Sequence, residues 1–264
     1  MIAFIIAAIL FFSIGNADVR EQEYSMTLTN SADISVMINI QMATVEIVGH
    51  NQNELKIESL SSTRPRASER ADGLRSLYAE GTDNTSLGLS VTFDGDNRVM
   101  ISSAQRRPGN FKIYVPNNVN VQFSESTPGY GSVKISDHNG RLEVNTTTGN
   151  IDIQNAKGPL LLRSAAGSIN VILSNLSDAG ESSIMSTSGS VDITVPENIS
   201  ANWRLQSAIG DIFTNLDIVT ERNPRQQGGA SWGRSFTIEG KTNNGGPLIS
   251  VRSDVSNIYI RKKE

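Results

Sequence analysis

The sequence contains no cysteine, few aromatic residues and no long apolar run beyond its first residues. Without cysteine, the chain can form no disulfide bond, no thiolate metal site, no cysteine nucleophile and no lipidated cysteine anchor. Aromatic residues make up only 6% of the chain, whereas Gly, Ser, Thr and Asn are abundant. This composition is typical of many short strands joined by turns. Because a spanning helix needs about 20 apolar residues, we expect no transmembrane span in the mature chain.

Charge and short motifs exclude further classes of protein. The chain has 23 Lys plus Arg against 27 Asp plus Glu, without the clustered basic face that nucleic acid favours, so we expect no nucleic-acid partner. The two histidines, His50 and His138, have no acidic cluster at ligand spacing, which indicates solvated turns rather than a metal site. No nucleophile elbow or phosphate-binding loop occurs. We therefore expect no metal, no cofactor and no catalytic residue.

The N-terminus has the pattern of a signal peptide. Residues 2–14 form an apolar run that is broken only by Ser13, and Gly15-Asn16-Ala17 follow with small residues at the first and third places. The run is too short to span a bilayer, and no Lys or Arg precedes it. We predict that residues 1–17 are a signal peptide cleaved after Ala17, so that the protein is exported to the periplasm or the cell surface.

A nine-residue repeat organises the middle of the chain. Glycine opens five successive lines of nine residues, at Gly131, Gly140, Gly149, Gly158 and Gly167. The third and fifth places of each line are aliphatic, as at Ile151 and Ile153, and the place between them is mostly polar, as at Asp152. Alternation with a period of two predicts strands with one buried face. We expect Ile151 and Ile153 to point inward and Asp152 to point outward.

Alternate turns resemble one another more closely than neighbouring turns do. The turns TTTG, SAAG, STSG and SAIG end at Gly149, Gly167, Gly189 and Gly210, which are 18, 22 and 21 residues apart. The larger repeat is therefore a pair of strands, and stacking such pairs about 4.8 Å apart builds one continuous core. The sequence predicts an all-β fold, a β-solenoid of either hand, with the repeat glycines at corners that need positive φ. The alternative is an antiparallel β-sandwich or meander.

We interpret residues 18–264 as a single β-strand-repeat domain. Its N-terminal part, to about residue 115, is irregular, and its regular repeats begin at about residue 131. Because the open ends of a solenoid would template edge pairing, the first hundred residues and the charged end at residues 261–264 are expected to cap the stack. Residues 94–97 (DGDN) predict a hairpin turn rather than a calcium loop, because the later Glu of such a loop is missing.

Two long segments break the repeat and are candidate contact loops. Residues 62–86 carry four arginines, Arg64, Arg66, Arg70 and Arg75, and residues 220–235 carry Trp232. Scaffolds place function on irregular loops, and Arg and Trp are enriched at binding hot spots. The alternative is that both segments brace or cap the solenoid.

Three aspartates, Asp152, Asp192 and Asp211, are interpreted as recurring at one phase of the repeat. In that arrangement they could line one face of a solenoid, as the carboxylates of a carbohydrate hydrolase do. Their neighbours Asn150 and Ser190 are equally polar, which favours a solvated outer face.

The lines TTTGNIDI, SAAGSINV and STSGSVDITV, preceded by YVPNNVNVQF, resemble the bacterial "putative adhesin" family, a β-strand-repeat domain of unknown function. The segments ADGLRSLYAEGTDNTSLGLSV and GGPLISVRSDVSNIYIRK are similar to exported forms in Bacteroidetes-type bacteria. The resemblance covers most of the mature chain and implies export, a repetitive β fold and a cell-envelope setting, with no catalytic residue. The spacings of 22 and 21 residues after Gly167 depart from the regular pattern.

These observations lead to three hypotheses of function. The first is a non-catalytic, exported cell-envelope protein, an adhesin that binds a surface polysaccharide or a partner protein of the envelope. The second is a structural or sensory module in envelope homeostasis that works by assembling with other proteins. The third is a solenoid carbohydrate-active enzyme, which would need an acid pair set apart from the repeat. We adopt the first, since no such pair stands out.

Overall fold

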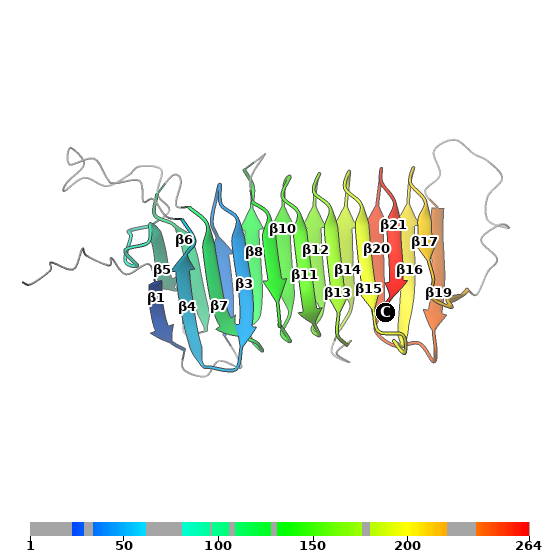
Figure 1. Cartoon of the computed structure of the whole chain (residues 1–264), viewed down its shortest axis with the longest axis horizontal. Coiled ribbons are helices and arrows are strands. Elements are labelled where there is room, and N and C mark those ends of the chain that lie inside the picture. The colour runs from blue at the N-terminus through cyan, green and yellow to red at the C-terminus, as the bar shows by residue number, and fades with distance from the viewer. Residues whose placement is uncertain are drawn as a thin grey trace, which may run out of the picture.

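The computed structural model describes residues 23–28, 34–61, 81–95, 97–105, 109–127, 131–175, 180–220 and 236–263. Within these ranges the regular elements are 21 strands, which form two sheets that face each other along an elongated rod (Figure 1). No helix of the described residues has the length and hydropathy needed to cross a bilayer.

Among the described residues, the strands of each sheet follow one another in an order that differs from the chain order. Sheet A has ten strands, in the order β1 (Glu23–Thr27), β4 (Glu54–Ser59), β7 (Phe111–Pro116), β3 (Val45–His50), β9 (Val133–Ser136), β11 (Ile151–Ala156), β13 (Ile169–Leu173), β15 (Val191–Val195), β21 (Ile258–Lys262) and β17 (Ile212–Thr214). Sheet B has eleven, in the order β18 (Val219–Thr220), β19 (Phe236–Thr242), β16 (Ala201–Ser207), β20 (Leu248–Ser253), β14 (Ser182–Ser186), β12 (Leu160–Ser164), β10 (Leu142–Thr146), β8 (Asn120–Glu125), β2 (Ser35–Asn39), β6 (Arg98–Ser103) and β5 (Leu89–Phe93).

The central strands pair in parallel, one coil apart. In sheet A, Ile151 pairs with Val133 on one side and with Ile169 on the other, and in sheet B, Leu142 pairs with Leu160. Each coil therefore gives one strand to each sheet and stacks on the next coil. The β-solenoid prediction is confirmed, and the antiparallel alternative is wrong for the centre of the rod. Antiparallel pairs occur at its ends, as between β5 and β6, which the predicted turn at residues 94–97 joins.

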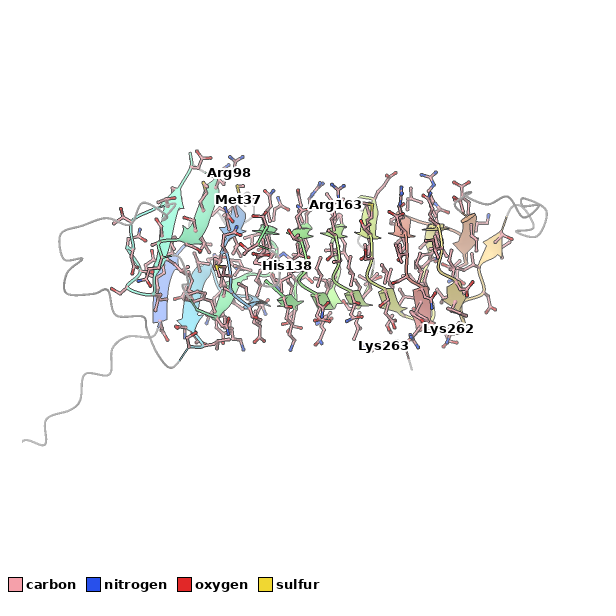
Figure 2. All side chains as sticks on the ribbon, turned by 90° about the horizontal axis from the view of Figure 1, so that it is seen from above. Met37, Arg98, His138, Arg163, Lys262 and Lys263 are labelled. Carbon is pink, nitrogen blue, oxygen red and sulfur yellow. The ribbon has the colours of Figure 1, made fainter. Side chains whose placement is uncertain are left out.

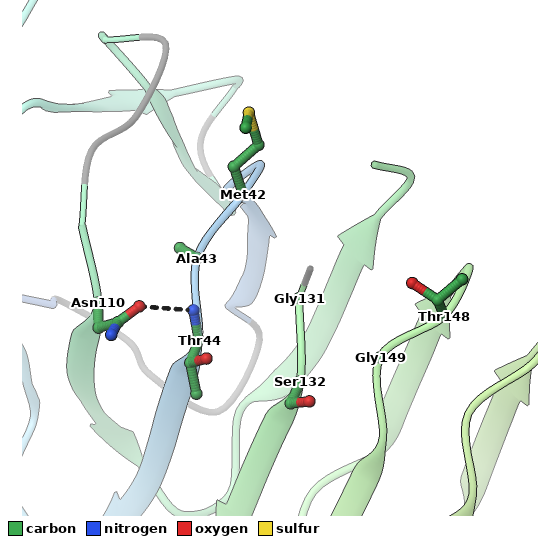
Figure 3. Close-up of a pocket in the computed structure, with 8 residues that line it drawn as sticks. All are labelled: Met42, Ala43, Thr44, Asn110, Gly131, Ser132, Thr148 and Gly149. Atoms are coloured by element: carbon green, nitrogen blue, oxygen red, sulfur yellow. Dashed lines mark hydrogen bonds between the residues drawn. The ribbon is translucent and has the colours of Figure 1, made fainter. Parts of the chain in front are cut away.

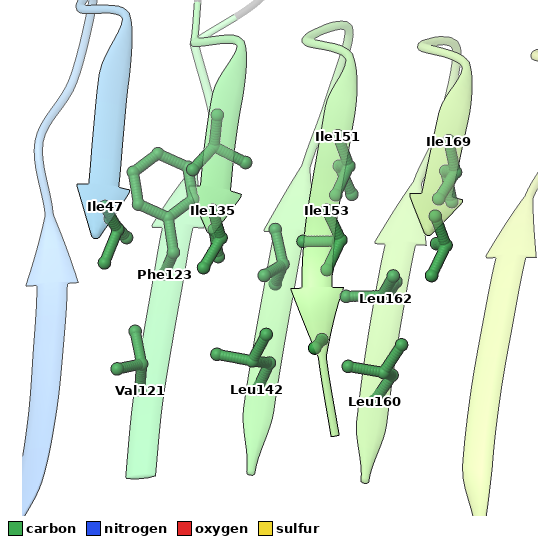
Figure 4. Close-up of a cluster of buried hydrophobic side chains, with 14 of the residues drawn as sticks. Ile47, Val121, Phe123, Ile135, Leu142, Ile151, Ile153, Leu160, Leu162 and Ile169 are labelled. Atoms are coloured by element: carbon green, nitrogen blue, oxygen red, sulfur yellow. The ribbon is translucent and has the colours of Figure 1, made fainter. Parts of the chain in front are cut away.

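The core is a ladder of mainly aliphatic side chains between the two sheets, with aromatic members such as Phe123 (Figure 4). Ile151 and Ile153 are buried in it, and Asp152 lies on the outer side, as the alternation predicts. Full burial of one such side chain contributes about 2 kcal/mol. Because a single coil buries its stripe only against its neighbours, the stack as a whole forms the core.

Each terminal coil is inserted inside the stack rather than placed at its end. Strands β2 and β3 lie between the coil of β6 and β7 and the coil of β8 and β9. Strands β20 and β21 lie between the coil of β14 and β15 and the coil of β16 and β17, as Figure 1 shows in red. The predicted caps are therefore right for β1, β4 and β5 but wrong for β2, β3 and Arg261. Every coil presents the same aliphatic stripe, so chain order does not dictate stacking order.

The corner glycines are needed for close approach rather than for positive φ. Of the seven repeat glycines, Gly131 alone has positive φ, at 88°; the other six are Gly140, Gly149, Gly158, Gly167, Gly189 and Gly210. A Cβ on Gly167 or Gly189 would lie far inside the 3.0 Å that real Cβ atoms keep from other atoms, against the carbonyl oxygen of the neighbouring coil's glycine. The predicted reason is corrected: the backbones of stacked corners leave no room for a side chain.

Buried hydroxyl groups connect successive corners. Ser164, Ser186 and Ser253 occupy the same place in three coils, and each side chain is fully buried. Each hydroxyl donates a hydrogen bond to the corner glycine carbonyl of the neighbouring coil, at 3.3, 3.0 and 3.1 Å respectively. Each also accepts a bond from the backbone N–H three residues later, at 2.9, 2.9 and 3.2 Å. The donor and an acceptor lone pair of each hydroxyl are thus satisfied, which offsets the cost of burial.

Candidate functional site

One row of side chains crosses the outer face of sheet A at a single register position. Taken strand by strand, its members are Glu58, Lys112, Glu46, Lys134, Asp152, Asn170, Asp192, Tyr259 and Phe213. The first part of the row alternates in charge, the middle is polar, and the last two places, on β21 and β17, are aromatic. Because neighbouring strands lie about 4.8 Å apart, the members of the row are within reach of one another.

Two aromatic rings stack at the end of this row. The ring centroids of Phe213 and Tyr259 are 5.4 Å apart, and their planes differ by 12°. The Tyr259 hydroxyl accepts a hydrogen bond from Asn257 Nδ2 at 3.0 Å. Strand β17 is the edge of sheet A, so no described strand lies on the far side of Phe213, which is 49% exposed. An exposed ring whose orientation is fixed by stacking is a preformed contact surface.

An ion pair holds the other side of Tyr259. The Arg261 guanidinium lies 5.2 Å from the centroid of the Tyr259 ring. The same guanidinium donates hydrogen bonds to both oxygens of the Asp192 carboxylate, from Nε to Oδ1 at 2.9 Å and from Nη2 to Oδ2 at 2.6 Å. The hydrogen bond to Asp192, followed by the Asp192 charge, raises the pKa of Arg261. Arg261, Tyr259 and Phe213 thus form one stack that the Asp192 carboxylate anchors.

The three aspartates that were expected to share one phase do not. Asp152 and Asp192 lie in the row on either side of Asn170, which donates a hydrogen bond from Nδ2 to Asp152 Oδ1 at 2.8 Å. Asp211 lies at the corner, and Phe213 takes the place in the row. The prediction failed because Asp152 and Asp192 follow their corner glycines by three residues, whereas Asp211 follows its glycine at once.

A cavity of about 400 Å³ opens between the corners of four coils (Figure 3). Its lining residues are Met42, Ala43, Thr44, Asn110, Gly131, Ser132, Thr148 and Gly149. None of these side chains titrates, and Asn110 Oδ1 already accepts a hydrogen bond from the Thr44 backbone N–H at 2.9 Å. The cavity therefore offers shape and hydrogen-bonding groups, but its lining holds no acid or base that could activate the hydroxyl groups of Thr44, Ser132 and Thr148.

His138 is buried, which corrects the prediction of a solvated turn. Its side chain is fully inaccessible between the two layers (Figure 2). Nε2 donates a hydrogen bond to the Val119 carbonyl at 2.8 Å. Burial lowers the pKa of His138 to about 4, against the smaller opposing effect of that hydrogen bond, so the imidazole is neutral at pH 7. His50, in the other turn, is partly exposed, and its Nε2 lies 2.9 Å from the Glu54 carbonyl. The described residues hold no cluster of three metal-ligating side chains.

The whole length of this stack corresponds to a known family. Residues 13–261 match the sequence model of a family described as Toastrack DUF4097. The chain belongs to the Toastrack DUF4097 family. The family resemblance inferred from the repeat lines is thereby confirmed, as is the strand-repeat fold that it implies. Among curated protein sequences, none matches this Toastrack chain.

Two crystal structures are similar to the Toastrack chain. One is described as a "putative cell adhesion protein" of Clostridium sporogenes; the similarity covers 91% of this chain and 99% of the other, with 12% identity and a TM-score of 0.46. The second is described as a "putative adhesin" of Bacteroides fragilis; the similarity covers 91% of this chain and 96% of the other, with 11% identity and a TM-score of 0.29.

The contact residues predicted for the Toastrack chain lie outside the described residues. This holds for Arg64, Arg66, Arg70, Arg75 and Trp232. The stack of Phe213 on Tyr259 was missed, because 45 residues separate the two in the sequence and the insertion of β21 brings them together. One signal was visible: Phe213 stands three residues after its corner glycine, where the lines of Gly149, Gly167 and Gly189 carry Asp or Asn.

Proposed function

We propose that this Toastrack protein is a non-catalytic component of the bacterial cell envelope, exported to the periplasm or the cell surface, where it binds a surface polysaccharide or a partner protein. In this proposal, residues 1–17 are a cleaved signal peptide, and residues 18–264 act as one domain. The apolar run and the small residues before Asp18 support export.

The exposed apolar side chains on the last coils of the rod carry this proposal. Ile209 is 77% exposed, Val219 61%, Phe213 49% and Val255 48%. Ile209 and Val255 stand at the third place of the corner, which earlier coils fill with small residues, namely Thr148, Ala166 and Ser188. Stacking of the coils therefore does not require large apolar residues there. Exposed apolar side chains that the fold does not require are typical of a contact site.

The arrangement of polar groups supports binding rather than catalysis. Asp152 is hydrogen-bonded to Asn170, and Asp192 is paired with Arg261. General acid–base catalysis would need a carboxyl or imidazole group directed at a substrate site. The cavity of Figure 3 has no such group in its lining, and His138 is buried away from solvent.

The two segments that break the repeat belong to the proposal as contact loops. Arg64, Arg66, Arg70 and Arg75 are placed in the first loop and Trp232 in the second, on the composition of those segments. The second loop connects β18 to β19, so it joins the rod at the end that carries Val219.

Capture experiments on residues 18–264 test the proposal. The immobilised protein is incubated with polysaccharide and, separately, with protein extracted from the envelope of its native bacterium. We expect capture without shortening of the polysaccharide. The triple variant Arg64→Ala, Arg66→Ala, Trp232→Ala should capture less while keeping a nearly unchanged Tm.

Three outcomes would contradict parts of the proposal. Depolymerisation of the polysaccharide would show that the protein is a carbohydrate-active enzyme and not a non-catalytic binding protein. A stable complex with a membrane protein, without polysaccharide capture, would favour the sensory module in envelope homeostasis. A native protein that retains Met1, measured by intact mass, would exclude cleavage of the signal peptide.

A further inference from the structure

The position of Phe213 can be compared with the equivalent positions on the other strands of sheet A. The same outer place of sheet A is Asp152 on β11, Asn170 on β13 and Asp192 on β15, all polar and all compatible with the stack. On the last two strands it becomes Tyr259 and Phe213. Since three coils stack without an aromatic residue at this place, the two rings are not required for the fold.

The open face of Phe213 is held rigidly. One face of the ring lies on Tyr259, which in turn lies against Arg261. Arg261 is fixed by its two hydrogen bonds to Asp192, and the Tyr259 hydroxyl is fixed by Asn257. No described strand covers the other face of Phe213, because β17 ends sheet A. A ligand that stacks there loses little free energy in ordering the protein.

Polar groups flank the ring along the chain. Asp211 and Asn215 stand two residues before and two residues after Phe213, so an extended chain spaces the three residues at intervals of about 7 Å. All three are exposed. Asn215 Oδ1 accepts a hydrogen bond from the Lys262 backbone N–H at 2.8 Å, which fixes its amide. A carboxylate and an amide on either side of a flat apolar ring match the alternating hydroxyl groups and C–H face of a pyranose sugar.

The charges nearby favour a neutral ligand. Asp192 is paired with Arg261, Asp254 is paired with Arg252 at 2.7 Å, and Asp217 is paired with Lys262 at 3.3 Å. All three ion pairs are internally neutral, which leaves the Asp211 carboxylate to accept hydrogen bonds from hydroxyl groups. An anionic polymer would be repelled by Asp211, and a lipid surface would favour unpaired basic side chains, whereas Arg252, Arg261 and Lys262 are each paired with an aspartate.

We infer that the β17 edge of sheet A is a binding site for a neutral, pyranose-based glycan, with one sugar ring stacked on the open face of Phe213 and its hydroxyl groups bonded to Asp211 and Asn215. The inference rests on the proposed function, since it names the polymer and the place where that polymer is bound. Phe213 and Asp211 are the contacts, and Tyr259 and Arg261 position Phe213.

Titration of residues 18–264 with cellohexaose and with chitohexaose, followed by isothermal calorimetry, tests the site. We expect at least one of the two to bind, and Phe213→Ala to weaken that binding about tenfold or more, the equivalent of about 1.4 kcal/mol. Phe213→Trp should retain binding, because it keeps a flat ring, and Asp211→Asn should weaken it. Phe93→Ala is the matched control: Phe93 is 56% exposed, on β5 at the opposite end of sheet B, and its loss should leave binding unchanged.

Each contrary result has a definite meaning. Equal loss of binding in Phe93→Ala and Phe213→Ala would overturn the site. If neither oligosaccharide binds while the wild-type protein still captures envelope polysaccharide, this inference fails and the proposed function stands. If neither oligosaccharide binds and sedimentation shows self-association that Phe213→Ala abolishes, the occupant is a second copy of the chain and the glycan site is wrong. If the protein captures nothing from the envelope, the proposed function fails as well.

Discussion

At the scale of single residues, glycine and serine have separate tasks at the corners of the rod. Glycine allows the backbones of adjacent coils to approach until a carbonyl oxygen stands where a Cβ would be, as at Gly149 against Gly131. Serine fills the inner side of the corner with a hydroxyl group that bonds both coils, as Ser164 does. Replacement of either residue acts on two coils at once.

Replacement of Gly149 by alanine should destabilise the protein by about 3 kcal/mol. Its Cβ would meet backbone atoms of Gly131 and Ser132, which cannot turn aside as a flexible side chain would. Gly95 is the matched control, because it has a positive φ of 72° and open space around its Cβ position. Gly95→Ala should cost about 1 kcal/mol of backbone strain. Denaturant melts measure the free energy of unfolding of the two variants. A larger loss in Gly95→Ala would show that the corners need glycine for its backbone conformation and not for the close approach of neighbouring coils.

Protonation of His138 should make stability depend on pH in the acidic range. The pKa is about 4 in the folded chain and 6.5 for an unperturbed histidine, so between these values the unfolded chain binds the proton and the folded chain does not. The free energy of unfolding should therefore fall as pH falls from 6.5 to 4, by about 3 kcal/mol in all from this group. His138→Gln should remove this part of the dependence, because an amide does not titrate there. Urea melts at several pH values between 4 and 6.5 measure this dependence. If the free energy of unfolding changes equally with pH in the two proteins, His138 is excluded as the cause.

At the scale of elements, the coil of β20 and β21 joins two parts of the rod that would otherwise not touch. β20 pairs with β14 on one side and β16 on the other, and β21 pairs with β15 and β17. Residues 180–220 therefore stack without interruption only when the last residues of the chain are in place. The coil of β2 and β3 has the same position near the other end, between β6–β7 and β8–β9.

Removal of residues 247–264 should detach β16, β17, β18 and β19 from the stack. Strands β16, β18 and β19 would then pair only with one another and would lose the coil that joins them to the stack, while the coils up to β15 would keep their neighbours. Hydrogen exchange should show lost protection in residues 201–220 and 236–242, with protection retained in residues 142–173. A control that lacks only the terminal residues 263–264 should behave as the full chain. Protection that persists in β16 of the shorter chain would contradict this prediction, because it would mean that β16 can pair directly with β14 when β20 is absent.

At the scale of the whole molecule, the rod combines a repetitive centre with non-local ends. Central coils pair over 18 to 22 residues, whereas β15 and β21 pair across 67 residues. Such pairs close only after the chain between them has folded, which slows folding and couples the two ends to the centre. An elongated scaffold of this kind presents long, flat faces, and the contacts proposed for it are at the end that carries Phe213 and in the two segments that break the repeat.

The sequence by itself determined the strands, their inward and outward faces and the two-sheet solenoid, because each of these depends on local alternation and on the spacing of turns. It also located the corner glycines, although it assigned them the wrong cause. Only the tertiary structure decided the order in which the coils stack, the burial of His138 and the pairing of Phe213 with Tyr259. The physical reason is that all coils carry the same aliphatic stripe and can pair with any other coil. Which coil stacks on which depends on how the two ends of the rod are covered, and no local sequence pattern predicts this.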